Sequence, residues 1–171
     1  KSKKPFFTTL FSLSSHPPYS IPYDYKEKFS KSSNKVYRST EYTDFALKKF
    51  FKSIRNKEWF KNTIFIITAD HTSPKQFNKA YKNIIGRLAI PMIWYKGDNT
   101  MHGEKKNIVQ QTDIMPSILE YIGYDKTFIS FGKSMFSNQS WAITKRKEDI
   151  YLLTENGINI HNNDKYFCFE D

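Results

Sequence analysis

The fold is decided by the stretch NTIFIITADHTS at residues 62–73. Within it, Ile64–Ile67 is apolar without alternation, rich in β-branched and aromatic side chains, and too short for a helix. A run of this kind is typical of a central strand that is covered on both faces of its sheet. In open α/β sheets, ligands bind just beyond the carboxyl ends of such strands. Asp70 and His71 follow this strand, so the sequence predicts a functional site there.

Asp70 and His71 together offer one oxygen donor and one nitrogen donor. An adjacent pair of this kind suits a single divalent cation such as zinc or manganese. The alternative is structural, with Asp70 capping a helix and His71 lying on the surface without a role. The pair alone leaves both interpretations open.

A second apolar run, Pro5–Leu13, also predicts a strand and leads into a polar turn that contains His16. If the two strands are parallel neighbours, His16 emerges at the same sheet edge as Asp70 and His71. The two prolines after His16 disfavour a helix or a central strand at that point. His16 is therefore a candidate site residue, and a surface histidine without a role is the alternative.

The remaining sequence predicts helices and strands in alternation. Beyond the two strands, the patterns predict a helix at about 39–56, a strand at 88–95, a helix at 112–123, a hairpin at 150–160 with a type I′ turn at Asn156-Gly157, and a candidate third strand at 165–169. A helix followed by a strand favours a parallel sheet. The expected fold class is α/β, with a mainly parallel sheet flanked by helices and a C-terminal antiparallel hairpin.

Composition excludes several classes of protein. The chain has 171 residues, is 39% hydrophobic and has a single cysteine, Cys168, so we expect one globular domain without an internal disulfide or a thiolate metal cluster. No apolar run approaches the roughly 20 residues that cross a bilayer. The net charge of +10 comes from scattered lysines with only four arginines, which argues against nucleic acid as a partner.

Three strings of residues carry a resemblance to a known family. They are Pro5–Phe11 with Ser14–Pro17, Phe65–His71, and Gln111–Gly123 with Ser130–Gly132. In this order they resemble the sulfatase / alkaline phosphatase superfamily, and within it they are most similar to the lipoteichoic acid synthase-like branch. Members of that branch transfer phosphoglycerol or related groups outside the cytoplasmic membrane. The resemblance implies an alkaline phosphatase-like fold, present in part.

The resemblance also implies roles for the candidate residues. Asp70 and His71 would bind the catalytic divalent cation, manganese by preference, with zinc, calcium or magnesium as alternatives. His16 would hydrogen-bond a phosphate- or sulfate-bearing substrate of the cell envelope. The implied location is extracytoplasmic, with the full-length protein anchored in the membrane by segments absent from this sequence.

The family's nucleophile and a further acidic ligand lie upstream of the position that matches Pro5, so no residue here is assigned as the nucleophile. We therefore expect residues 1–171 to be the C-terminal part of a catalytic domain that needs its N-terminal half for activity. The implied reaction is phosphoglycerol-type transfer, and hydrolysis by a sulfatase or phosphodiesterase is the alternative. A non-catalytic module that binds anionic envelope polymers is the alternative of another class.

Overall fold

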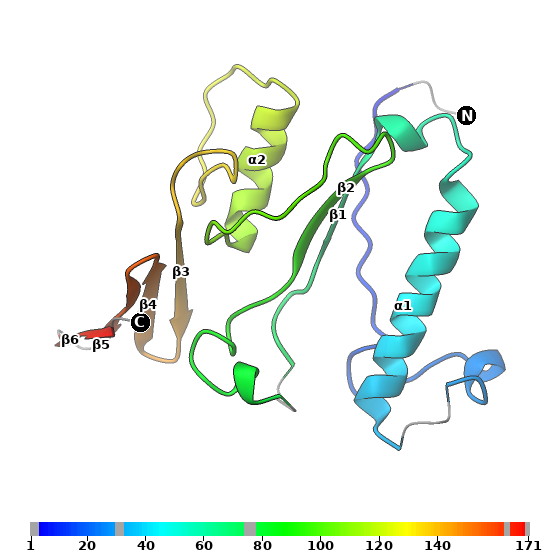
Figure 1. Cartoon of the computed structure of the whole chain (residues 1–171), viewed down its shortest axis with the longest axis horizontal. Coiled ribbons are helices and arrows are strands. Elements are labelled where there is room, and N and C mark those ends of the chain that lie inside the picture. Colours follow the sequence, from blue (N-terminus) through cyan, green and yellow to red (C-terminus); the bar gives the residue numbers. More distant parts are fainter. Residues whose placement is uncertain (1–3, 30–32, 74–77, 163–164, 170–171) are drawn as a thin grey trace. The chain divides into compact units, whose positions relative to one another are not determined.

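The computed structural model describes residues 4–29, 33–73, 78–162 and 165–169. The chain folds as two compact units, Lys1–His102 and Gly103–Asp171. The first unit contains the long helix α1 and two strands, and the second contains the short helix α2 and a four-stranded sheet (Figure 1). Short 3-10 helices lie at Tyr23–Tyr25, Phe60–Asn62, Lys79–Tyr81 and Gln111–Asp113.

Helix α1 spans Lys35–Ile54. It begins at Asn34, whose side chain accepts a hydrogen bond of 3.0 Å from the Val36 backbone N–H. The predicted start at Ser39 or Thr40 is wrong, because the hydroxyls of both residues donate to the Val36 carbonyl within the helix instead of capping it. The asparagine satisfies an otherwise unpaired N–H in the first turn, so the helix starts there.

Strands β1, Ile64–Thr68, and β2, Met92–Lys96, form a two-stranded antiparallel sheet in which Ile66 faces Trp94. Both strands were predicted, although β2 begins at Met92, directly after Pro91, instead of at residue 88. The aromatic side chains of α1 pack on this pair, with Phe51 at ring distances of 5.2 Å from Phe65 and 5.5 Å from Tyr95. Ile64–Ile67 is half-buried in the described structure, so this strand is less covered than the sequence predicts.

The α/β class is confirmed, but the pairing is not the expected one, since all strand pairs among the described residues are antiparallel. A parallel pair needs a crossover connection, usually a helix. Helix α1 is not such a crossover, because Pro5–Leu13 before it joins no described ladder. This run is extended but unpaired, which corrects its prediction as a strand. A strand exists only with a hydrogen-bonded neighbour, and sequence propensity cannot supply one.

In the second unit, helix α2 spans Ile114–Tyr121, which confirms the predicted helix. Gly123 follows it with a φ of +72°, a conformation typical of the residue that ends a helix. Four antiparallel strands follow in the order of the chain: β3, Trp141–Arg146; β4, Asp149–Thr154; β5, Gly157–Asn162; and β6, Lys165–Phe169.

The predicted hairpin corresponds to β4 and β5, and the candidate third strand is β6. The predicted type I′ turn is wrong. Thr154 pairs with Gly157, so Glu155 and Asn156 form the loop, and of these residues only Gly157 has a positive φ. A type I′ turn needs a positive φ at both central residues.

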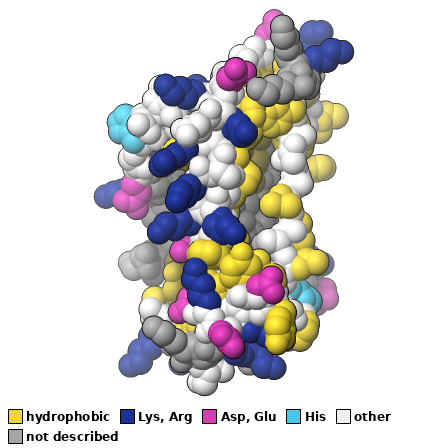
Figure 2. Space-filling view, turned by 90° about the vertical axis from the view of Figure 1, so that its right-hand side faces the viewer, with side chains coloured by type: hydrophobic (Ala, Val, Ile, Leu, Met, Phe, Trp, Pro, Cys, Tyr) yellow, Lys and Arg dark blue, Asp and Glu magenta, His cyan; other side chains and the backbone are white. Residues whose placement is uncertain are grey.

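Few hydrophobic side chains are buried. In the part of the chain that the structure describes, the buried ones are Phe29, Ile54, Phe60 and Ile158. Figure 2 shows hydrophobic side chains reaching the surface beside rows of lysine and arginine side chains, on the side of the molecule that carries α1. No described helix has both the length and the apolar character needed to cross a bilayer.

Candidate functional site

Two threonine hydroxyls hold the turn that follows β1. The Thr68 hydroxyl donates to the Pro91 carbonyl at 2.9 Å, and the Thr72 hydroxyl donates to the Arg87 carbonyl at 2.7 Å. Both acceptors lie in the segment that leads into β2. These hydrogen bonds therefore hold the turn that carries Asp70 and His71 on both sides to the segment that leads into β2.

Asp70 and His71 lie against each other within this turn. The His71 backbone N–H donates to Asp70 Oδ1 at 2.9 Å, and His71 Nε2 lies 3.5 Å from Asp70 Oδ2. His71 Nδ1 is 2.7 Å from the Thr72 carbonyl oxygen. A carbonyl oxygen only accepts, so Nδ1 carries the proton and Nε2 of the neutral ring presents its lone pair. Histidines that ligate metals commonly have their second nitrogen fixed in this way.

The spacing of the two donor atoms fits one divalent cation. Two ligand atoms that each lie about 2.1 Å from a cation are about 3.4 Å apart at a tetrahedral angle. The separation of Nε2 and Oδ2, 3.5 Å, is close to that value. The side chains of His71 and Asp70 are 68% and 55% exposed, so a cation and further ligands can approach them. Asp70 caps no described helix, because the next one is the 3-10 helix at Lys79–Tyr81, capped by Asn78.

A complete metal site would need more ligands than this pair. Among the described residues, no group of three or more histidine, cysteine, aspartate or glutamate side chains is placed to hold a metal ion. The donor set therefore fits a cation whose remaining ligands come from elsewhere.

His16 lies in the polar turn after the extended run. Its Nδ1 is 2.8 Å from the Pro17 carbonyl, its backbone N–H donates to the Leu13 carbonyl at 3.0 Å, and its own carbonyl accepts from the Tyr19 N–H at 2.7 Å. The ring is exposed, and Nδ1 carries a proton for the same reason as in His71. The structure thus brings Asp70 and His71 together, while the described contacts of His16 are those of its own loop.

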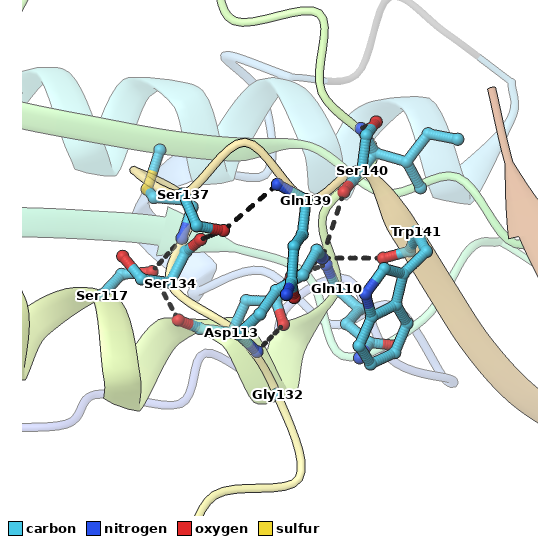
Figure 3. Close-up of polar contacts among 12 residues, drawn as sticks. Gln110, Asp113, Ser117, Gly132, Ser134, Ser137, Gln139, Ser140 and Trp141 are labelled. Carbon is cyan, nitrogen blue, oxygen red and sulfur yellow. Dashed lines mark hydrogen bonds and ion pairs between the residues drawn. The ribbon is translucent and has the colours of Figure 1, made fainter.

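The second unit contains a buried ion pair that sequence reasoning missed, between Lys133 and Asp113. Figure 3 shows Asp113 among the polar groups that surround it. Lys133 Nζ lies 2.8 Å from Asp113 Oδ2 and also donates to the Trp141 carbonyl at 2.7 Å. The same carboxylate accepts the backbone N–H of Gln110 at 3.0 Å and that of Lys133 at 2.9 Å. The side chains of Lys133 and Asp113 are only 5% and 1% exposed. Nothing in the sequence pattern links Asp113 to a lysine 20 residues later.

Ser117 and Gly132 complete this cluster. The Ser117 hydroxyl donates to the Asp113 carbonyl at 2.6 Å and accepts the Met135 N–H at 2.8 Å. A Cβ at Gly132 would lie 2.3 Å from the Thr112 carbonyl oxygen and 2.7 Å from the Asp113 nitrogen, so only glycine fits there. Every polar atom named here is used inside the protein, which identifies the cluster as a structural clamp between the start of α2 and the 132–141 segment.

Comparisons with known proteins agree with the three strings found in the sequence. A family model described as Sulfatase matches residues 1–124. Lipoteichoic acid synthases of Staphylococcus aureus, strains USA300 and NCTC 8325, are each 26% identical to the chain over 155 residues, which covers 80% of the chain and 24% of the relative. The chain thus spans about a quarter of the length of the curated relatives it matches.

A solved structure gives the same fold. It is a protein in the alkaline phosphatase superfamily from Vibrio parahaemolyticus, with a TM-score of 0.82 at 23% sequence identity, and the match covers 99% of this chain and 42% of that one. The predicted alkaline phosphatase-like fold, present in part, is therefore confirmed.

Proposed function

This chain belongs to the sulfatase family, and from that premise we propose that it supplies part of the active site of a metal-dependent enzyme that acts on phosphate or sulfate esters. The reaction proposed first is phosphoglycerol-type transfer to or from a cell-envelope glycolipid or polymer. Similarity to lipoteichoic acid synthases supports this choice. Hydrolysis of a sulfate ester or phosphodiester is the alternative within the same family.

One observation carries the proposal: Asp70 and His71 present a carboxylate oxygen and an imidazole nitrogen 3.5 Å apart at the end of β1. These residues would hold one divalent cation, for which we propose manganese, with zinc, calcium or magnesium as alternatives. An oxygen and a nitrogen donor suit manganese and zinc in particular. Such a cation supplies charge neutralisation at the transferring group and lowers the pKa of a bound nucleophile.

His16 is proposed to bind a non-bridging oxygen of the transferring group. Its Nδ1 proton is engaged by the Pro17 carbonyl, so the ring donates from Nε2 only when both nitrogens are protonated. In that form His16 is a cation and its hydrogen bond to an anionic oxygen is charge-assisted. Hydrogen-bond donors aimed at oxygens that gain charge in the transition state accelerate such reactions.

We propose that residues 1–171 are the C-terminal part of the catalytic domain. The nucleophile would then come from the N-terminal half of the same domain. The exposed apolar run supports this, since Phe7 is 83% and Leu10 is 88% exposed. Contiguous exposed apolar side chains mark surfaces that other protein covers. Partners proposed for the whole protein are an anionic envelope substrate and, through segments outside this sequence, the membrane, with the catalytic domain outside the cytoplasm.

The test is metal-dependent turnover of a phosphate or sulfate ester by the full-length protein. We expect cleavage of phosphatidylglycerol or of an aryl sulfate ester with Mn²⁺ and none after chelation. The variant Asp70→Asn/His71→Gln should lose more than about 100-fold in turnover, because loss of a hydrogen-bond partner behind a metal ligand already costs about 10–100-fold. It should also lose Mn²⁺ binding in equilibrium dialysis.

The matched control is Asp125→Asn/His102→Gln, which removes the same two chemical groups from exposed positions. It should keep both turnover and metal binding. Full activity in the Asp70/His71 variant would contradict the assignment of the ligands, and the ester that is turned over faster identifies the branch of the family.

A further inference from the structure

Thr72 contacts the His71 ring through its backbone and is itself held through its side chain. The Thr72 carbonyl oxygen lies 2.7 Å from His71 Nδ1. The Thr72 hydroxyl donates to the Arg87 carbonyl, also at 2.7 Å. The orientation of the His71 ring therefore depends, through one intervening residue, on a carbonyl that lies 15 positions after Thr72 in the chain.

Arg87 belongs to residues 78–88, a loop in the connection between β1 and β2 (Figure 1). The Arg87 N–H donates to the Asn83 carbonyl at 3.1 Å, and the Arg87 Nε donates to the Lys82 carbonyl at 3.2 Å. The Asn83 side chain accepts the Gly86 N–H at 2.7 Å. All of these hydrogen bonds form within the loop, so they fix Arg87 without help from the candidate metal ligands.

Close packing also holds this loop. A Cβ at Gly86 would lie 2.3 Å from the Ala80 carbonyl oxygen and 2.5 Å from the Tyr81 Cα. Only glycine allows two backbone segments to approach so closely. Compact loops that are packed on themselves are frequently functional. The loop is thus a firm support, and a hydrogen bond orients a neighbouring group well only when its partner is itself held.

We propose that Thr72 is a positioning residue, whose hydroxyl ties loop 78–88 to the metal ligand His71 and fixes the tautomer of that ring. The proposal rests on the proposed function, because that function gives His71 a cation to bind. A carbonyl that accepts from Nδ1 leaves the Nε2 lone pair free for the cation. Without the hydrogen bond to Arg87, the Thr72 carbonyl can turn away from the ring, and the other tautomer becomes populated.

Thr63 provides a matched comparison for Thr72. Its hydroxyl donates to the Trp59 carbonyl at 2.7 Å, the same length as the bond from Thr72 to Arg87, and both threonines are half-buried. Thr63 lies directly before β1, whereas Thr72 lies in the turn after it. Substitution by valine removes one hydroxyl hydrogen bond in either case, but only Thr72 adjoins the His71 ring.

The first measurement uses the full-length protein with ¹⁵N-labelled histidine, free of metal and at about pH 8, where an ordinary imidazole is neutral. The His71 signals are those that disappear in His71→Gln. The unmodified protein should carry the proton on Nδ1, and Thr72→Val should show a mixture of the two tautomers. Thr72→Ser, which keeps the hydroxyl, and Thr63→Val should both keep the proton on Nδ1.

The second measurement is the dissociation constant for Mn²⁺, obtained by equilibrium dialysis without substrate. Thr72→Val should weaken binding about tenfold, at the lower end of the range for lost partners of a metal-ligating histidine, because the hydroxyl acts through the carbonyl. Thr72→Ser and Thr63→Val should change the constant less than about twofold.

A His71 tautomer that is unchanged in Thr72→Val overturns the proposal, as does unchanged affinity for Mn²⁺ where the unmodified protein binds it. An equal effect of Thr72→Ser or of Thr63→Val also overturns it, since the first retains the hydroxyl and the second lies away from the ring. No binding of Mn²⁺ by the unmodified protein would contradict the proposed function. The tautomer of metal-free His71 still decides the role of Thr72 in that case, so the two failures are distinguishable.

Discussion

Two aspartates, each beside a nitrogen base, have opposite surroundings in this molecule. Asp70 lies next to His71 at the end of β1, with its side chain 55% exposed. Asp113 lies against Lys133 in the second unit, with its side chain 1% exposed. Asp113 accepts two backbone N–H groups and an ammonium at 2.8–3.0 Å, whereas the Asp70 Oδ2 faces the imidazole Nε2 at 3.5 Å.

The difference shows how to tell a structural carboxylate from one that can bind a ligand. Asp113 has its hydrogen-bonding capacity used by groups that are themselves fixed, so an incoming cation would have to displace Lys133. Asp70 and His71 have donor atoms at a spacing that suits a cation and a surface that admits one. A buried carboxylate whose hydrogen bonds are all made within the protein indicates a structural role. Exposed donor atoms that converge on one point indicate a binding site.

The largest expected effect is on stability at the buried pair. Lys133→Ala leaves the Asp113 charge buried without its counter-ion, which costs about 3–5 kcal/mol in the free energy of unfolding. Urea unfolding measures this value. Lys126→Ala, at an exposed position of the same unit, serves as the control and should stay within about 0.5 kcal/mol. A loss below about 1 kcal/mol for Lys133→Ala would show that the clamp is not structural.

The next effect concerns the close approach at Gly132. Gly132→Ala should cost about 1–3 kcal/mol, because the new methyl group meets the Thr112 and Asp113 backbone, which cannot move aside as a side chain can. Gly97→Ala gives the comparison, since there the methyl group meets the Phe60 ring. Thermal unfolding of both variants should rank Gly132→Ala as the more destabilised, and the reverse order would contradict the close backbone contact.

A smaller effect is expected at the exposed pair. Asp70→Ala should change the free energy of unfolding without metal by less than about 0.5 kcal/mol, as is usual for surface substitutions. Binding of Mn²⁺ should fall in the same variant. Chemical unfolding and equilibrium dialysis on one preparation measure the two quantities. A large loss of stability in the absence of metal would make Asp70 a structural residue like Asp113.

The smallest effect is a titration at the end of β2. Two hydrogen bonds, the stronger effect from Lys96 and the weaker from Thr100, lower the pKa of Asp98 from 3.8 to about 2. Because the folded-state pKa is lowered, the stabilisation is complete above pH 3.8 and is lost as the pH falls through about 2. Lys96→Met should return the pKa of Asp98 towards its ordinary value, as carboxyl NMR titration would show. An unchanged midpoint would show that this ion pair does not control the carboxyl.

Local patterns predicted the parts of the fold that local interactions determine. The strand Ile64–Thr68 and the helix Ile114–Tyr121 were found because the residues that favour and terminate them lie within or directly beside the elements themselves. Pro5–Leu13 has the same composition as a strand but lacks a described partner, which no propensity can reveal. Strand β3, Trp141–Arg146, was not predicted, and its last two residues are charged.

The candidate site was predictable for a similar reason. Asp70 and His71 are neighbours in sequence, so their pairing required no knowledge of the fold. The Asp113–Lys133 pair joins residues 20 positions apart, and the hydrogen bond from Thr72 to the Arg87 carbonyl spans 15 positions. Both features depend on how the chain folds. The residue types that form them also occur on any solvated surface, so the sequence alone does not reveal them.

The unpaired run Pro5–Leu13 has a consequence for handling the protein. Its apolar side chains are exposed, with Phe7, Leu10 and Phe11 at 66–88%, and an extended backbone without a ladder partner is a template for intermolecular strand addition. Where nothing covers this run, a second molecule can pair with it edge to edge. Aggregation that grows steeply with protein concentration, and that a proline or lysine within the run suppresses, is the behaviour this surface implies.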